Sequence, residues 1–221
     1  MTADIIEIFS SIQGEGKFAG CRQVFVRFAG CNLNCAYCDT DFSSRDNFMT
    51  AEQVSAIIKK YSDDTPIHSV SFTGGEPLLH GKFILEVAEL INNKIFLETN
   101  GTLYNQLEKI LPAIDIISMD IKLPSVIGKN LFDLHRKFIE IAGAKDLYIK
   151  IVVSAETVED EFIAAIDLIP KNILLVIQPV TPCNNIKIAS AEKILSLQSL
   201  ALKKISDVRV IPQTHRIISV M

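Results

Sequence analysis

The chain has 221 residues, of which 48% are hydrophobic and 22% are charged, and its formal net charge is -4. This length and composition exclude a disordered or fibrous chain and predict one globular domain over residues 1–221. No basic run marks a nucleic-acid surface, no stretch of about 18 apolar residues marks a membrane span, and the N-terminus lacks the apolar core of a signal peptide. We therefore expect a cytoplasmic protein that binds neither nucleic acid nor membrane.

Short apolar, β-branched runs alternate along the chain with longer stretches of helical periodicity. The runs predict strands over residues 23–30, 69–73, 94–98, 115–121, 147–153, 173–179 and 208–212. The periodic stretches predict helices over residues 51–61, 82–92, 104–111, 131–142, 157–169 and 190–204. This α/β alternation, with about six repeats, favours right-handed crossovers in an open doubly wound sheet or in a full or partial barrel.

The cysteine-rich stretch CNLNCAYC follows the first predicted strand and contains Cys31, Cys35 and Cys38. Function in such folds gathers at the carboxyl ends of the strands, where this loop would lie. Three thiolates can hold three corners of an iron–sulfur cluster and leave one iron open to another ligand. Two alternatives remain from the residues alone. One is a purely structural thiol cluster, and the other is a zinc site closed by Cys183 or by a histidine, namely His68, His80, His135 or His215.

Polar residues also follow the later predicted strands. SFTGGEP ends the second one, and its Gly74 and Gly75 would let backbone approach a ligand closely, although a tight turn is the alternative. LETNG, SMDIK and IQPV end three others, and simple strand termination is the alternative there. These segments would line a pocket with Thr73, Glu76, Thr99, Asn100, Ser118, Lys122 and Gln178.

In the N-terminal stretch IFSSIQGEG, Gln13 and Glu15 alternate with Gly14 and Gly16. An amide and a carboxylate suit the edge of a guanidine-like heterocycle, and Gly14 and Gly16 would permit close approach of backbone to it. The alternative is a glycine-containing turn that happens to carry polar side chains.

CNLNCAYC, with Tyr37 before its third cysteine, resembles the CxxxCxxC signature of radical S-adenosylmethionine (SAM) enzymes, and GGEP resembles a second element of that superfamily. The resemblance implies a partial TIM-type (β/α)6 barrel, a [4Fe-4S] cluster on the three cysteines, and SAM on the open iron. It also implies a set of residues that contact SAM, comprising Tyr37, Gly74, Gly75, Glu76, Thr99, Asn100, Ser118, Lys122 and Gln178.

SIQGEG before FVRFAGCNLNCAYCDT, with QTH near the C-terminus, is similar to the 7-carboxy-7-deazaguanine synthase family. The resemblance implies a carbon–nitrogen lyase that converts 6-carboxy-5,6,7,8-tetrahydropterin to 7-carboxy-7-deazaguanine with loss of ammonia, on the route to queuosine. It implies Mg²⁺ held by Thr40, a flavodoxin or ferredoxin as reductant, and a homodimer.

The same resemblance implies roles for residues at both ends of the chain. Arg27 would pair with the substrate carboxylate and act with Glu15 and Gln13 in catalysis. The alternative for Arg27 is a strand-edge ion pair with an acid such as Glu15. The substrate would be bound by N-terminal and C-terminal segments that comprise Ile12, Gln13, Gly14, Glu15, Gly16, Arg27, Thr73 and His215, with Gln213 as a further candidate.

Two other functions remain open at this point. A glycyl-radical activating enzyme also carries CxxxCxxC and acts on a protein partner, but it has no evident need for the polar SIQGEG and QTH elements. A non-catalytic zinc or iron–sulfur module would have no open metal position and no affinity for SAM. The sequence assigns no role to Cys21.

Overall fold

The structure is a computed structural model that describes residues 1–38, 41–182 and 186–220. These residues form one nine-stranded sheet in the order β3-β1-β2-β4-β5-β6-β7-β8-β9. From β2 to β9 every neighbouring pair is parallel, whereas β1 runs antiparallel to β2 and β3. The strands are β1 (Thr2–Ile12), β2 (Arg22–Phe28), β3 (Phe48–Thr50), β4 (Ser69–Gly74), β5 (Ile95–Thr99), β6 (Ile116–Asp120), β7 (Asp146–Val153), β8 (Leu174–Pro179) and β9 (Val208–Val210).

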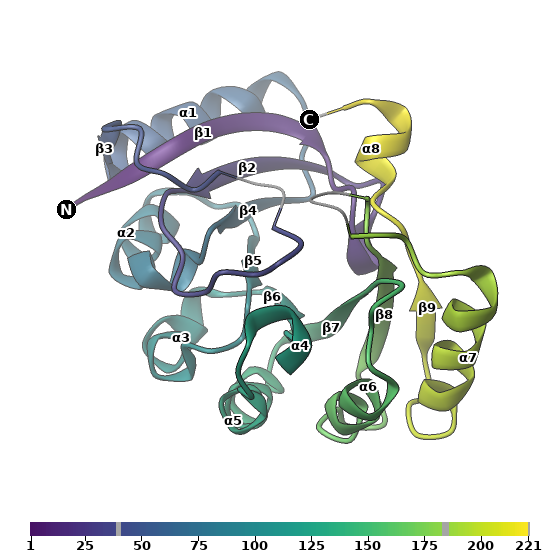
Figure 1. Ribbon diagram of the computed structural model, residues 1–221. Coiled ribbons are helices and arrows are strands. Elements are labelled where there is room, and N and C mark those ends of the chain that lie inside the picture. The colour runs from purple at the N-terminus through teal and green to yellow at the C-terminus, as the bar shows by residue number, and fades with distance from the viewer. Residues whose placement is uncertain (39–40, 183–185, 221) are drawn as a thin grey trace.

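The sheet curves, and the crossover helices cover its convex face (Figure 1). Since β3 and β9 end the strand order without pairing to each other in the described chain, the barrel stays open, and the predicted partial (β/α)6 barrel is confirmed. The helices are α1 (Ala51–Asp64), α2 (Gly81–Leu90), α3 (Tyr104–Ile110), α4 (Pro124–Ile127), α5 (Phe132–Ala142), α6 (Glu159–Ile166), α7 (Ala191–Leu202) and α8 (Thr214–Ile218), with 3-10 turns η1 (Gly16–Phe18), η2 (Pro77–His80) and η3 (Leu111–Ala113).

The seven predicted strands are all present, but the sequence analysis did not predict β1 or β3. β1 carries Asp4 and Glu7 among its apolar residues and lies at the antiparallel margin, so it lacks the continuous apolar run of a strand buried on both faces. The predicted start of the first helix is confirmed, because Thr50 and Gln53 form a capping box at α1. None of the described helices is long and apolar enough to cross a membrane.

A small apolar cluster fills the interior of the barrel at the amino ends of the strands. It contains Phe96, Tyr148 and Val176, and Phe18 of η1 packs against it. The Phe18 ring lies 5.9 Å from that of Phe96 and 6.2 Å from that of Tyr148, in edge-on contacts. Because these side chains fill the amino-terminal half of the barrel, a cavity can form only near the carboxyl ends of the strands.

The C-terminal segment returns from β9 to the chain after β1, where α8 lies near the end of that strand (Figure 1). The backbone N–H and the hydroxyl of Thr214 donate to the Gly14 carbonyl at 2.8 and 3.0 Å. A side chain at Gly14 would collide with the imidazole of His215. The fold therefore brings the SIQGEG and QTH segments together, although they lie at opposite ends of the sequence.

Candidate active site

A cavity of about 580 Å³ opens at the carboxyl ends of the parallel strands. Its walls include the cysteine loop after β2, the glycines after β4 and the ends of β5, β6, β7 and β8. A second cavity of about 140 Å³ adjoins it beneath the C-terminal segment. The residues that line both are Glu15, Arg27, Thr73, Glu98 and Gln213.

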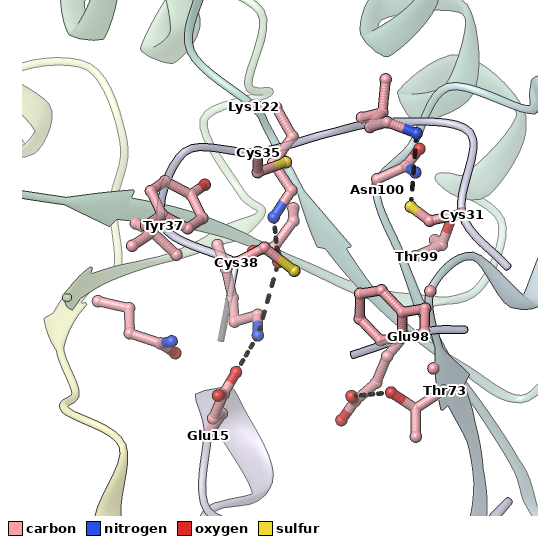
Figure 2. A pocket seen from close by; sticks show the side chains of 18 of the residues that line it. Glu15, Cys31, Cys35, Tyr37, Cys38, Thr73, Glu98, Thr99, Asn100 and Lys122 are labelled. Carbon is pink, nitrogen blue, oxygen red and sulfur yellow. Dashed lines mark hydrogen bonds and ion pairs between the residues drawn. The ribbon is translucent and has the colours of Figure 1, made fainter. Parts of the chain in front are cut away.

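The three thiols of Cys31, Cys35 and Cys38 lie at the larger cavity and face a common space from one loop (Figure 2). The loop is anchored by the Ala36 N–H, which donates to the Val126 carbonyl at 3.1 Å. Burial raises the pKa of the Cys31 and Cys35 thiols, so a cationic metal centre is the partner that would favour their thiolate form. Three thiols on one short loop fit an iron–sulfur cluster.

The histidines considered for a zinc site lie away from the thiols. Within the described chain no histidine lines the larger cavity. His135 is buried under the strand ends, His80 stacks on Phe28 at 4.8 Å, and His68 packs on Phe18 at 4.7 Å. Cys183, Asp39 and the predicted magnesium ligand Thr40 lie outside the described residues, as does any contact that they make.

Gly74 and Gly75 line the cavity, but the structure gives a different reason for glycine there than the one we expected. Gly74 has φ +128°, and a side chain on it would collide with the backbone of Phe28. A side chain on Gly75 would collide with the Gly30 carbonyl and come within 2.8 Å of Cys31 Cβ. The two glycines therefore let the turn after β4 pack directly against the start of the cysteine loop.

Glu76 is fully buried, and its carboxylate is held by the protein and does not line either cavity. Its oxygens accept hydrogen bonds from Leu78 N at 3.0 Å, from Thr99 Oγ1 at 2.8 Å and from Asn100 N at 2.8 Å. Burial raises the pKa of Glu76 to about 7, although these donors oppose the shift. In this structure Glu76 supports the ends of β4 and β5.

Asn100 is fixed from several sides. Its carbonyl lies 3.2 Å from His135 Nε2, and its amide donates to Asn32 Oδ1 of the cysteine loop at 2.8 Å. Asn32 in turn donates to Thr102 Oγ1 at 2.8 Å. This network joins the cysteine loop to the end of β5.

The remaining predicted cofactor contacts, Thr99, Ser118, Lys122 and Gln178, all line the larger cavity with Tyr37. Ser118 Oγ, Gln178 Oε1 and Asp120 Oδ1 are buried without a hydrogen-bond partner in the described protein. Buried polar atoms are normally satisfied, so these three suit a polar ligand such as SAM. The donor set therefore fits both the cluster and SAM.

Lys122 lies between Asp120 and Tyr37. Its ammonium is 3.0 Å from Asp120 Oδ2 and 5.3 Å from the centre of the Tyr37 ring. Burial lowers the pKa of Lys122, but the Asp120 carboxylate and the other neighbouring groups together outweigh burial and hold the pKa above its usual value. Burial also raises the pKa of Tyr37 to about 12, so its hydroxyl stays protonated at neutral pH.

Gln13 and Glu15 are held by a polar network. The Gln13 amide donates to Gln23 at 3.0 Å and to Glu98 Oε1 at 2.7 Å, while Thr73 donates to Glu98 Oε2 at 2.8 Å. Glu15 forms an ion pair with Lys150 and accepts from Gln213 Nε2 at 2.7 Å. Burial alone would raise the pKa of Glu15, but these partners lower it to about 2.

Arg27 lies at the boundary of the two cavities, and it forms the strand-edge ion pair with an acid that was its alternative. It forms an ion pair with Glu7 of the neighbouring strand, with Nε 2.6 Å from Oε1, and not with Glu15. Ile12, Gly14 and His215 line the smaller cavity as predicted neighbours. Gly16 does not line either cavity, because it packs against the Tyr148 ring.

The sequence reasoning missed three charged residues that line the larger cavity, Glu98, Asp120 and Lys150. Two of them stand inside the quoted motifs LETNG and SMDIK. Lys150 is a lone charge in the apolar run LYIKIVV, and a charge in such a strand could have served as the signal. Cys21 has no place among the lining residues.

The sequence matches the radical SAM superfamily over residues 25–169. It is 40% identical to 7-carboxy-7-deazaguanine synthase of Geobacter sulfurreducens, covering 97% of this chain and 96% of that one. The chain belongs to the 7-carboxy-7-deazaguanine synthase family of radical SAM enzymes. A further member, from Methanothermobacter thermautotrophicus, is 39% identical over 98% of this chain and 97% of its own.

Solved structures support the fold of this synthase family member. The crystal structure of QueE from Escherichia coli has a TM-score of 0.63, with 21% identity over 97% of this chain and 95% of that chain. A radical SAM methyltransferase from Sphaerobacter thermophilus has a TM-score of 0.62, with 12% identity over 93% of this chain and 77% of that chain. Membership of the superfamily implies a [4Fe-4S] cluster and SAM.

Proposed function

We propose that this protein converts 6-carboxy-5,6,7,8-tetrahydropterin to 7-carboxy-7-deazaguanine with release of ammonia. The observation that carries the proposal is the meeting of SIQGEG and QTH at a cavity that adjoins the cysteine loop. A small polar heterocycle held there would lie beside a cofactor bound at the strand ends. A protein-sized substrate, which an activating enzyme would require, has no comparable use for a polar cavity of this size.

The cysteines would hold the cluster, and the cluster would bind SAM through its open iron. When bound, these groups would supply radical chemistry that can begin with removal of a hydrogen atom from C6 of the pterin. SAM would be bound by Gly74, Thr99 and Asn100, together with the unpartnered atoms of Ser118 and Gln178. The protein contributes orientation and exclusion of water, which protect a radical from side reactions.

Gln13, Glu15 and Arg27 would recognise the substrate. Glu15 is an anion at neutral pH and can accept hydrogen bonds from the amino and ring N–H groups of the pterin. Arg27 offers a planar cation to the pterin carboxylate. Thr73 and His215 complete the walls of the cavities in which this substrate would lie.

Other parts of the proposal rest on the resemblance to the family. Mg²⁺ would be held by Thr40 together with substrate oxygens and water, since Mg²⁺ takes few protein ligands. A flavodoxin or ferredoxin would supply the electron, and the enzyme would work as a homodimer of single-domain chains in the cytoplasm, where thiols remain reduced.

An anaerobic assay tests the proposal. The reconstituted protein is mixed with dithionite, SAM, Mg²⁺ and 6-carboxytetrahydropterin, and the products are followed by mass spectrometry. We expect 7-carboxy-7-deazaguanine and ammonia, with SAM largely conserved. Formation of 5'-deoxyadenosine without the deazapurine would reject the substrate, and a colourless protein that binds zinc and leaves SAM intact would reject the radical chemistry.

A further inference from the structure

A row of alternating charges crosses the floor of the larger cavity, from the SIQGEG segment to the cysteine loop (Figure 2). Glu15 pairs with Lys150, and Lys150 Nζ lies 3.9 Å from Asp120 Oδ2. Asp120 Oδ2 lies 3.0 Å from Lys122 Nζ, which faces Tyr37. Lys150 is thus the link between the substrate side and the cofactor side of the site.

Lys150 has a position that apolar packing alone does not explain. It lies on β7, is only 5% exposed, and points into the cavity from a strand whose other described residues after Asp146 are apolar or aromatic and buried. Burial of an ammonium is costly unless the charge is paired. An aliphatic residue would fill this space at lower cost, so the charge is best explained by what it does to its partner.

Glu15, the partner of Lys150, is held through both oxygens of its carboxylate. Lys150 engages Oε2 of Glu15 and Gln213 Nε2 donates to Oε1 at 2.7 Å. Gln213 is itself held by Thr181. The position and the negative charge of the carboxylate are therefore both fixed before a ligand binds. Each oxygen still has a lone pair that can accept a hydrogen bond from a ligand.

We propose that Lys150 is a positioning residue that keeps Glu15 ionised and oriented to receive the N–H groups of the pterin. The proposal deepens the proposed function and rests on it, because it takes the ligand of Glu15 to be a guanidine-like edge. Lys150 acts through Glu15 and does not exchange a proton with the substrate.

The charges around Glu15 support this assignment. Burial raises the pKa of Glu15, and the Lys150 ammonium is the strongest influence that opposes it. Without Lys150 the pKa of Glu15 would rise, and the carboxyl would take up a proton as the pH falls. The charged and titratable groups that surround this pair are Glu98, Asp120 and His215 from other elements and Tyr148 from β7 itself.

The test compares Lys150→Met with wild type in the reconstituted enzyme. We expect the KM for 6-carboxytetrahydropterin to rise about tenfold to a hundredfold, as for loss of a charge-assisted contact. The cluster absorbance and the slow cleavage of SAM without pterin should stay unchanged. The ratio of the variant KM to the wild-type KM should grow as the pH is lowered and fall as it is raised, because alkaline pH restores the Glu15 anion.

Two further variants separate positioning from a merely structural role. Lys17→Met removes an exposed ion pair between Lys17 and Asp146 (2.5 Å), which joins the same two segments outside both cavities, and it should leave KM unchanged. The double variant Lys150→Met with Glu15→Gln removes both charges, so it avoids a buried unpaired carboxylate. Its KM should stay raised and its ratio to wild type should no longer depend on pH.

A KM for Lys150→Met within twofold of wild type, or a KM ratio that stays constant with pH, would overturn the proposal. A Lys150→Met protein that fails to fold while the double variant folds with normal KM would overturn it as well, since Lys150 would then only neutralise a buried charge. Absence of product from the wild-type enzyme would instead contradict the proposed function itself.

Discussion

Arg27 and Glu7 face each other across β1 and β2 at opposed register positions, with Arg27 Nε 2.6 Å from Glu7 Oε1. The guanidinium also lies over the Phe9 ring, with Cζ 5.8 Å from its centre. A carboxylate can bind two nitrogens of one guanidinium at once, but the closest contact of Glu7 is with Nε. Glu7 can therefore orient Arg27 from one side while the guanidinium still lines both cavities.

Arg27→Ala should weaken substrate binding without disturbing the cofactors. Loss of a bidentate charge-assisted contact costs about 2–3 kcal/mol, so we expect the KM for the pterin to rise about 30-fold to 150-fold. Steady-state kinetics measure the change, and the electron paramagnetic resonance spectrum of the reduced cluster should match wild type. Arg22→Ala serves as the control, because it removes an exposed arginine whose side chain donates to Ser10 on the same pair of strands. Unchanged KM in Arg27→Ala would remove Arg27 from the substrate site.

Cys35→Ala should abolish the cluster, because two thiols from the loop cannot hold it. We expect less than a tenth of the wild-type iron and sulfide and no visible absorbance near the cluster bands after anaerobic reconstitution. Cys21→Ala is the matched control, since Cys21 lies outside both cavities, and it should reconstitute fully. A Cys35→Ala protein with a full complement of iron would show that this thiol is not a ligand.

The sequence was sufficient for the parallel part of the fold, since strands such as β7 and β8 are nearly continuous apolar runs, as expected for a sheet covered on both faces. It did not reveal β1, because Asp4 and Glu7 interrupt its apolar pattern and its pairing with β2 is a long-range contact. It also could not choose between an open sheet and a barrel, as both share the same alternation.

The site was predictable where a motif stands at a strand end, as with Asn100, and unpredictable where a contact joins distant segments. The pairing of Glu15 with Lys150 joins residues 135 positions apart in the sequence, and no local pattern encodes it. The glycines show a second limit of prediction from sequence. Gly75 lines the cavity as expected, but glycine is required there because a side chain would collide with the start of the cysteine loop.

Asn32→Ala should loosen the cysteine loop although it removes no metal ligand. Asn32 donates to Thr102 and accepts from Asn100, both at 2.8 Å. Loss of two such bonds, each worth about 1 kcal/mol, should speed amide hydrogen exchange in residues 31–38 about thirtyfold in the metal-free protein. The substitution Asn105→Ala, at an exposed position on α3, controls for the loss of an asparagine. Equal exchange in Asn32→Ala and wild type would mean that the network does not order the loop.

Glu76 should make the metal-free protein more stable in mild acid. Burial raises the pKa of Glu76 from 4.5 to about 7, so the folded protein binds this proton more tightly than the unfolded chain. The stabilisation is complete below pH 4.5 and is lost as the pH rises through 7. This pKa shift corresponds to about 3 kcal/mol in the free energy of unfolding.

His135 changes the stability of the folded protein in the opposite direction over the same pH range, so its effect must be separated from that of Glu76. Burial lowers the pKa of His135 from 6.5 to about 4, so its contribution is present above pH 6.5 and is lost as the pH falls through 4. Both residues hold Asn100, one through its N–H and the other through its carbonyl. The wild-type stability will therefore vary little between pH 4.5 and 7, even though each group contributes strongly.

Substitution of one partner makes the compensation visible. Urea unfolding of wild type and Glu76→Gln at several pH values gives the difference in their free energies of unfolding. That difference should increase by about 3 kcal/mol in favour of wild type as the pH falls from 7 to 4.5, because only wild type gains the proton. Glu108→Gln on the exposed face of α3 controls for removal of a carboxylate. A constant difference across this range would mean that Glu76 is already ionised in the folded protein, held by Leu78, Thr99 and Asn100 strongly enough to offset its burial.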